Sequence, residues 1–371
     1  MRQLLRDIAE IGAGQGAPQG DSNYCTDGIP FVKAGNMESL TSGGSLNDIL
    51  KVSERVARDH KLKLYPKGTV LFAKSGMSCL KGYVYVLPQE AYVVSHLACI
   101  TPKEDISDYL RFYFDYHRPN QLVKDPAYPS ISLADIGALE IDTKDAKSRE
   151  RIISVLRSVE AIIESRKQQL SNLDDLIKAR FVEMFGNPVR DEMGWPKRPL
   201  KDVCSKLNDG THFSPESFAS GDYKYITAKN IKPGGFDFSN ITYVPESVHR
   251  PIYERCNPEY GDVLYIKDGV TTGIAMVNTL EEEFTLLSSV ALLKQNREIM
   301  NGHFLCGILN NNEMYSDIRS NMGGAAITRL TIAKLNGIQV IVPPIGLQNQ
   351  FATFVAQVDK SKVVGAKRKI E

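Results

Sequence analysis

From Ser148 to Phe185, in a segment without Gly or Pro that is rich in helix formers, apolar residues recur every three or four positions, except where Arg166 and Arg180 take the expected place. Gly186 and Pro188 follow, and both are typical of a helix end. The pattern predicts a helix of about 38 residues, roughly 55 Å long and comparable to roughly 16 base pairs of duplex. A buried core helix of one large domain would be unusually long, so we favour a coiled-coil seam. The seam consists of Ile152, Leu156, Val159, Ile163, Leu170, Leu173, Ile177 and Met184.

Short apolar runs bounded by Gly-rich turns predict strands on both sides of this helix, together with shorter helices, and hence a mixed α/β fold. Two loops, Ile11 to Asp21 and Asn208 to Ser220, carry small and hydrogen-bonding groups that suit contact with base edges. The predicted strands are Gly68 to Phe72, Gly82 to Leu87, Ala91 to Ile100, Tyr223 to Thr227, Asp262 to Ile266, Ile274 to Val277 and Leu286 to Leu293, and the helices are Asp105 to Tyr116 and Asn301 to Asn310.

The chain contains an internal repeat of domain size. The run Gly68 to Gly76 returns as Gly261 to Gly269, an offset of 193 residues. Two further matches keep the same order: Ser95 to Ala98 returns as Ser288 to Ala291, and Ile131 to Ile141 returns as Leu330 to Val340. Because solenoid units run only about 20 to 50 residues, each copy should be a whole domain.

The repeat extends into the helix, because Phe351, Val355 and Val358 lie 199 residues after Ile152, Leu156 and Val159. The predicted order is a first domain over 1–145, a long helix over 146–187, a second domain over 188–345 and a short second helix over 346–371. Two copies joined head to tail commonly pack about a pseudo-twofold axis, which would make the two helices antiparallel.

Composition narrows the class of protein. The 371 residues are 42% hydrophobic, which is sufficient for packed cores, and no run reaches the ~18 apolar residues of a membrane span. The start of the chain lacks the apolar core of a signal peptide, so we expect a cytoplasmic protein. Its 45 Lys and Arg against 44 Asp and Glu leave no global positive field, so any surface for DNA must be local. The six cysteines are scattered and predict buried free thiols rather than a metal site.

Motifs for catalysis are absent from the sequence. Gly12, Gly14 and Ala17 fit a dinucleotide-binding pattern, but Pro18 and Gly20 follow where a helix should begin, which indicates a loop. There is no Walker loop, HExxH motif or nucleophile elbow. An Asn-Pro-Pro-aromatic motif for methyl transfer to adenine is also missing, and the six histidines are dispersed. We therefore expect neither an active site, nor a metal site, nor a bound cofactor.

Polar and basic residues in matched loops are the candidates for DNA contact. Asn can pair with adenine, Arg and Lys with guanine, and Thr with a phosphate or a thymine methyl group. An ordinary solvated side chain is the alternative at each position, and Asp209-Gly210 and Asp268-Gly269 are interpreted as turn formers. The candidates in the first domain are Gln15, Gln19, Lys33, Asn36, Lys74, Ser75 and Lys81, and those in the second are Asn208, Thr211, His212, Lys229, Asn230, Lys267, Thr271, Thr272 and Arg329.

Several motifs in a fixed order resemble one known family. They include the helix exit FVEMFGNP from Phe181 to Pro188, the run Asp209 to His212, the run Ala228 to Ile231, and Gly261 to Gly269 followed by Ser288 to Leu293. Repeated around a long helix, they resemble the specificity subunit of a Type I restriction-modification system. The resemblance covers essentially the whole chain.

The resemblance implies a noncatalytic subunit that recognises a split, asymmetric site on double-stranded DNA, with a spacer set by the helices. It also implies that two methylation subunits dock on the helices and that restriction subunits join them. These partners would supply S-adenosylmethionine, ATP, magnesium and all the chemistry. The family's base-reading residues vary with the target sequence, so the resemblance assigns none here. The helix residues expected to contact a partner are Ile152, Leu156, Val159, Phe351 and Val355.

Two other functions remain open from the sequence. One is the recognition subunit of a Type IIB-like or stand-alone methyltransferase, and the other is a protein-binding scaffold that does not bind DNA. The short second helix would leave the start of the first helix without a partner in the chain. The apolar stripe exposed there should bind a methylation subunit, the first domain or a second copy, so the isolated chain is expected to self-associate unless its own domain covers the stripe.

Overall fold

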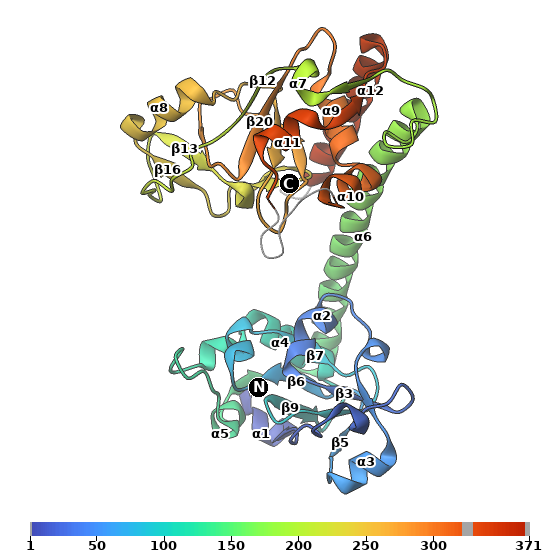
Figure 1. The fold of residues 1–371 in the computed structure, drawn as a ribbon. Coiled ribbons are helices and arrows are strands. Elements are labelled where there is room, and N and C mark those ends of the chain that lie inside the picture. Colours follow the sequence, from blue (N-terminus) through green and yellow to red (C-terminus); the bar gives the residue numbers. More distant parts are fainter. Residues whose placement is uncertain (1, 321–328, 368–371) are drawn as a thin grey trace. The chain divides into compact units, whose positions relative to one another are not determined.

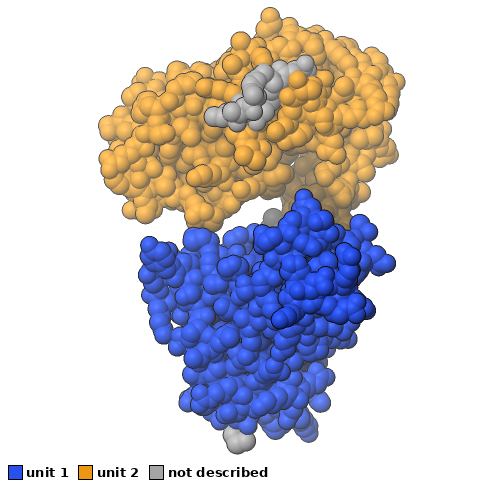
Figure 2. Space-filling model, turned by 60° about the horizontal axis from the view of Figure 1, so that its bottom comes forward, with its two compact units in different colours: residues 1–164 blue, residues 165–371 orange. Residues whose placement is uncertain are grey.

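The computed structural model describes residues 2–320 and 329–367, and the chain forms two compact units, residues 1–164 and 165–371 (Figures 1 and 2). Both units mix helices with antiparallel strands, so the predicted mixed α/β class is confirmed. Across the two described stretches of chain, no helix is long and apolar enough to span a bilayer.

Unit 1 is built on a four-stranded antiparallel sheet in the order β2-β9-β6-β7. The inner strand β6 is buried at every position, and α4 covers one side of the sheet, with its Phe114 packed against Phe72 of β6. A second sheet has the order β4-β3-β8-β5. The elements are β1 Arg2–Leu4, α1 Leu5–Ile8, β2 Ala9–Ala13, β3 Ile29–Val32, α2 Met37–Thr41, β4 Lys51–Val52, α3 Glu54–Asp59, β5 Leu64–Tyr65, β6 Val70–Ala73, β7 Val84–Val86, β8 Ala91–Val93, β9 Leu97–Pro102, α4 Ser107–Tyr116, α5 Leu133–Gly137 and β10 Glu140–Asp142.

Unit 2 repeats this design. Its main sheet has the order β12-β20-β17-β18, and a smaller sheet has the order β16-β13-β19. In both units the second sheet contains one parallel pair, β3 with β8 and β13 with β19. The elements are β11 Lys197–Pro199, α7 Leu200–Val203, β12 Cys204–Asp209, β13 Tyr223–Ile226, β14 Ile231–Lys232, β15 Gly235–Phe236, β16 Thr242–Val244, α8 Glu246–Arg255, β17 Val263–Ile266, β18 Ala275–Val277, β19 Thr285–Leu286, β20 Val290–Gln295, α9 Gly302–Leu309, α10 Asn312–Ser320, α11 Ile332–Gly337 and β21 Gln339–Ile341.

Two apolar runs predicted as single strands are each divided in the structure. Ala91 to Ile100 contains β8 and most of β9, and Leu286 to Leu293 contains the end of β19 and most of β20. The first strand of each run belongs to the second sheet of its unit and the second strand to the main sheet, because the chain crosses between the two sheets at a turn. One hydrophobic run therefore contributes a strand to each of two buried sheets.

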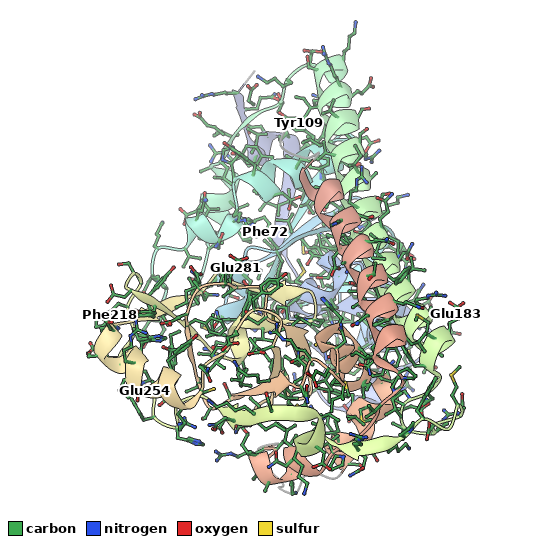
Figure 3. All side chains as sticks on the ribbon, turned by 90° about the horizontal axis from the view of Figure 1, so that it is seen from above. Phe72, Tyr109, Glu183, Phe218, Glu254 and Glu281 are labelled. Atoms are coloured by element: carbon green, nitrogen blue, oxygen red, sulfur yellow. The ribbon has the colours of Figure 1, made fainter. Side chains whose placement is uncertain are left out.

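The long helix is confirmed as α6, Ala146–Phe185, and the second helix is α12, Ile345–Lys367. Within unit 2 the two helices run antiparallel: Phe351 packs on Phe181, and further along α12 Lys362 pairs with Asp174 at 2.7 Å. Figure 3 shows α12 lying along α6, with Glu183 on the side of α6 turned away from α12.

Phe351 and Val355 belong to the core of unit 2, where Phe351 is fully buried among Phe181, Phe185 and Phe304. We therefore correct the prediction that these two side chains contact a partner subunit, because their partners lie within the chain. Sequence periodicity could place them on an apolar face but could not say which surface covers that face.

The start of α6 is partly covered by its own domain. Ile152 and Leu156 are half-buried, and Arg111 of α4 binds Glu160 of α6 with two hydrogen bonds of 2.8 Å. Asp108 of α4 also pairs with Arg157. An apolar stripe nevertheless remains open on the helix, with exposed fractions from 39% to 58%; we call it the α6 stripe, and it consists of Val155, Val159, Ile162, Ile163 and Leu170.

Candidate nucleic-acid interface

In each unit, two loops are brought together at one end of the main sheet. In unit 2, the loop after β12 is tied by a bridge between Thr211 and Leu287, and the loop after β17 by a bridge between Asp268 and Arg329. The matching bridges in unit 1 join Gln15 to Val94 and Ser75 to Ser130. Strands that end at the same edge of a sheet present their loops side by side, so each unit has one loop-bearing end, which we call the sheet end.

A close crossing of two chain segments holds each sheet end together. A Cβ atom on Gly14 would lie 1.9 Å from the carbonyl oxygen of Val93, and one on Gly210 would lie 1.9 Å from that of Leu286. Only glycine allows the backbones to approach this closely. The first glycine of the predicted loop Ile11 to Asp21 is part of β2, so that loop and its counterpart both begin later than predicted.

Four candidates in unit 2 are buried and support the loops rather than presenting a surface. They are Thr211, Asn230, Lys267 and Thr272. The hydroxyl of Thr211 donates to the carbonyl of Phe213, and that of Thr272 donates to the carbonyl of Gly269. Asn230 accepts a hydrogen bond from the amide of Thr227 and donates to the carbonyl of Asp237. We correct the prediction that these four contact DNA, because they are buried and their polar atoms are used inside the unit.

The remaining candidates in unit 2 lie nearer the surface. Lys229, Thr271 and Arg329 are exposed, and His212 is exposed with its Nε2 atom 3.0 Å from the buried carboxylate of Asp209. Asn208 is half-buried, and both ends of its amide bind Arg255 at 3.0 Å.

The candidates in unit 1 divide in the same way. The side chain of Gln15 accepts a hydrogen bond from the amide of Lys63, and that of Asn36 accepts one from the amide of Lys33. Asn36 thus closes a 3₁₀ turn, as Asn230 does in unit 2. These two amides support loops, and neither is fully exposed.

Other unit 1 candidates present polar groups at or near the surface. Gln19 and Lys81 are exposed, and Lys81 pairs with Glu38 at 2.7 Å. Lys33 lies over the ring of Tyr24, with its Nζ atom 4.3 Å from the ring centroid. Lys74 and Ser75 are half-buried, and the Ser75 hydroxyl lies 2.8 Å from Nδ1 of His96.

A buried group of charges at the sheet end of unit 2 was missed by the sequence analysis. Lys267 lies between the carboxylates of Asp209 and Asp268, and Arg255 at the end of α8 reaches Asp209 and donates to the carbonyl of Gly210. The available signal was a charged residue at the end of β12, Asp209, and two directly after the apolar strand β17, Lys267 and Asp268. The two aspartates are interpreted from the sequence as turn formers, because their pairing with distant residues cannot be seen there.

Potential metal ligands and cysteine thiols are the groups among the described residues that bear on whether the chain could hold a metal ion or a reactive thiol. Within residues 2–320 and 329–367, His, Cys, Asp and Glu side chains form no group of three that could hold a metal ion. All six cysteines are free thiols, but only Cys79, Cys99 and Cys256 are buried; Cys204 and Cys306 are partly buried and Cys25 is exposed. Burial raises the pKa of the Cys204 and Cys256 thiols to about 12, so neither is a nucleophile at neutral pH.

Comparison with known proteins identifies the family. The family model of the Type I restriction modification DNA specificity domain matches residues 4–174 and 192–371, so one copy covers each half of the chain. The chain belongs to this family. It is accordingly a noncatalytic subunit that recognises a DNA sequence, as the resemblance implied.

Individual relatives agree with this assignment. The Type I restriction enzyme MjaIX specificity subunit of Methanocaldococcus jannaschii is 21% identical over 381 residues, covering 95% of this chain and 84% of the relative. The fold is similar to the S subunit of a Type I system from M. genitalium, with a TM-score of 0.54, 14% identity and coverage of 99% and 91% of the two chains. A chain from a structural study of complex assembly in a type I restriction-modification system gives a TM-score of 0.53 at 15% identity, with coverage of 100% and 94%.

Proposed function

We propose that the sheet end of each unit reads one half of a split, asymmetric site on double-stranded DNA. The observation that carries the proposal is the repeated construction of the sheet end, with the same strand order, the same bridges and the same glycine crossing in both units. Two similar sheet ends whose loops carry different residues are suited to reading two different DNA sequences.

The candidates at or beside each sheet end that are exposed or half-buried, and are not used to hold the loops, are the proposed contacts. Basic side chains there would bind phosphates or guanine, and hydroxyl and amide groups would bind phosphates or other base edges. Asn208 and the four buried candidates hold the loops in unit 2, and Gln15 and Asn36 hold those in unit 1. The proposed contacts are Gln19, Lys33, Lys74, Ser75 and Lys81 in unit 1 and His212, Lys229, Thr271 and Arg329 in unit 2.

The helices are proposed to set the spacer and to receive the partner subunits. The α6 stripe is a row of exposed apolar side chains on a helix, and such a patch is typical of a protein contact. We propose that two methylation subunits dock there and that restriction subunits join the assembly in the cytoplasm. The partners would bring S-adenosylmethionine, ATP and magnesium, while this chain supplies sequence recognition.

The test uses the chain assembled with its methylation subunits, and the methylated motif is read from the genome of a host that carries the complex. Lys229→Ala and Thr271→Ala should relax or weaken recognition in one half of the motif only. Gln19→Ala and Lys81→Ala should affect the other half only. Arg297→Ala, an exposed residue just after β20 at the opposite end of the same sheet, is the control and should leave the motif unchanged.

The proposal predicts that each variant changes one half of the motif and leaves the spacer intact. Variants of unit 1 and unit 2 that alter the same half, or variants of both sheet ends that alter neither, would contradict it.

A further inference from the structure

The sheet end of unit 2 contains a lysine that is buried between two carboxylates. The side chain of Lys267 is 2% exposed, and its Nζ atom lies 2.9 Å from Oδ2 of Asp268 and 3.3 Å from Oδ2 of Asp209. Taking such charges out of water costs several kcal/mol per ion, and pairing offsets this cost only partly. A buried group of charges is therefore poor evidence of a contribution to the stability of the fold. Its position at the proposed DNA surface suits a functional role instead.

The group ends at the surface on an arginine. Oδ1 of Asp268 lies 3.5 Å from Nε of Arg329, whose side chain is 56% exposed, and a backbone bridge joins the same two residues. This Oδ1 atom is buried and makes no hydrogen bond to any described residue. Asp268 therefore approaches the inner edge of the guanidinium, and the two terminal nitrogen atoms of Arg329 extend from the other end.

The fold does not require the carboxylates. The positions in unit 1 that match Asp209, Asp268 and Arg329 are held by Ala13, Ser75 and Ser130, although the lysine is retained as Lys74. The same sheet order and the same bridge form without either acid. The charges are therefore particular to what unit 2 contacts.

We propose that Arg329 reads a guanine in the half-site of unit 2 and that Asp268 is its positioning residue. An arginine that approaches end-on can donate from both terminal nitrogens to O6 and N7 of guanine in the major groove, the commonest specific contact between a side chain and a base. The charge of Asp268 attracts the Nε edge at 3.5 Å, and Lys267 binds Asp268, so less rotamer freedom of Arg329 is lost on binding. The assignment rests on the proposed function, because it assumes that this sheet end faces DNA.

The first experiment measures methylation rates of the assembled complex on duplexes that carry its own motif. Each guanine is replaced in turn by 7-deazaguanine, which lacks the N7 acceptor. For the unaltered chain, one guanine in the half-site of unit 2 should lower kcat/KM about tenfold when replaced. With Arg329→Gln the rate on the natural motif should fall by a similar factor, and replacing that guanine should have no further effect.

The second experiment separates positioning from a general structural role. Asp268→Asn keeps the shape and removes the charge, so discrimination at the same guanine should fall at least threefold, with the other bases of the motif unaffected. A merely structural residue would instead lower thermal stability and weaken recognition at every position alike. Arg297→Gln is a matched control, because Arg297 is also exposed and lies 3.7 Å from a buried carboxylate, that of Asp262. It should leave guanine discrimination unchanged.

Two results would overturn the assignment. The first is that every guanine whose replacement by 7-deazaguanine slows the unaltered complex also slows the Arg329→Gln complex. The second is that Asp268→Asn leaves the discrimination of guanine from 7-deazaguanine unaltered. If Lys229→Ala and Thr271→Ala still alter the half-site of unit 2, the proposed function stands and only the role of Arg329 fails. If no unit 2 variant alters recognition, both fail.

Discussion

Removing the ring of Phe351 should release α12 from α6 and destabilise unit 2. Phe351 is fully buried, and its ring centroid lies 5.5 Å from that of Phe181 and 5.7 Å from that of Phe185, both with edge-to-face geometry. Truncating a buried phenylalanine to alanine typically costs about 3–5 kcal/mol, including about 0.5–1.5 kcal/mol for each aromatic pair. Against a domain stability of about 5–15 kcal/mol, Phe351→Ala should remove about a fifth or more of the free energy of unfolding.

The assay is urea unfolding followed by the fluorescence of Trp195, the only tryptophan in the chain. Its indole nitrogen donates to the carbonyl of Phe185, so the signal reports on unit 2 at the aromatic cluster. Val182→Ala is the control, because Val182 lies on the same helix with 48% of its surface exposed and should change stability by less than about 0.5 kcal/mol. A loss of under about 1 kcal/mol for Phe351→Ala would refute the account of how the two helices are joined.

Three further predictions concern the crossings, the buried histidine and the α6 stripe. Gly14→Ala should lower the free energy of unfolding of unit 1, measured by calorimetry, by at least about 2 kcal/mol, because its Cβ atom would meet a carbonyl oxygen. Gly16→Ala is the control and should be neutral, because a Cβ atom there meets open space. Equal effects of the two substitutions would contradict the account of the crossing. Burial lowers the pKa of His249 from its usual value of 6.5, so the unfolded chain binds more protons below about pH 6.5 and the stability of unit 2 should fall on acidification. Urea unfolding at about pH 7.5 and 5.5 should show this fall, and His249→Gln should reduce it; an identical fall in the variant would exclude His249 as its source. Val159→Glu combined with Ile162→Glu should prevent binding of a methylation subunit in pull-down assays and leave the melting temperature unchanged, and undiminished binding would show that the stripe is not the docking face.

The long helix and the repeat could be predicted because both depend on local or periodic patterns in the sequence. A segment from Ser148 to Phe185 without Gly or Pro has few alternatives to a helix. The repeated run Gly68 to Gly76 carries a buried strand with its turns, and a copied strand folds in the same way in both units. These features need no knowledge of distant contacts.

The environment of each site candidate depends on distant contacts and could not be predicted. Lys267 resembles an exposed loop lysine until Asp209, which lies 58 positions earlier in the sequence, is placed beside it. Phe351 shows an apolar face without showing what covers it. The division of Ala91 to Ile100 between two sheets has the same origin, because hydrophobicity reports burial but not the neighbouring strand.

The central claim, that two sheet ends read two half-sites at a distance set by the helix, is tested most directly by lengthening α6. One heptad inserted near Gln168 falls between Glu160, which pairs with Arg111 in unit 1, and Asp174, which pairs with Lys362 in unit 2. It adds about 10 Å, or about three base pairs. The methylome of a strain carrying the insertion should show both half-sites unchanged and the spacer longer by about three base pairs, and an unchanged spacer would contradict the account.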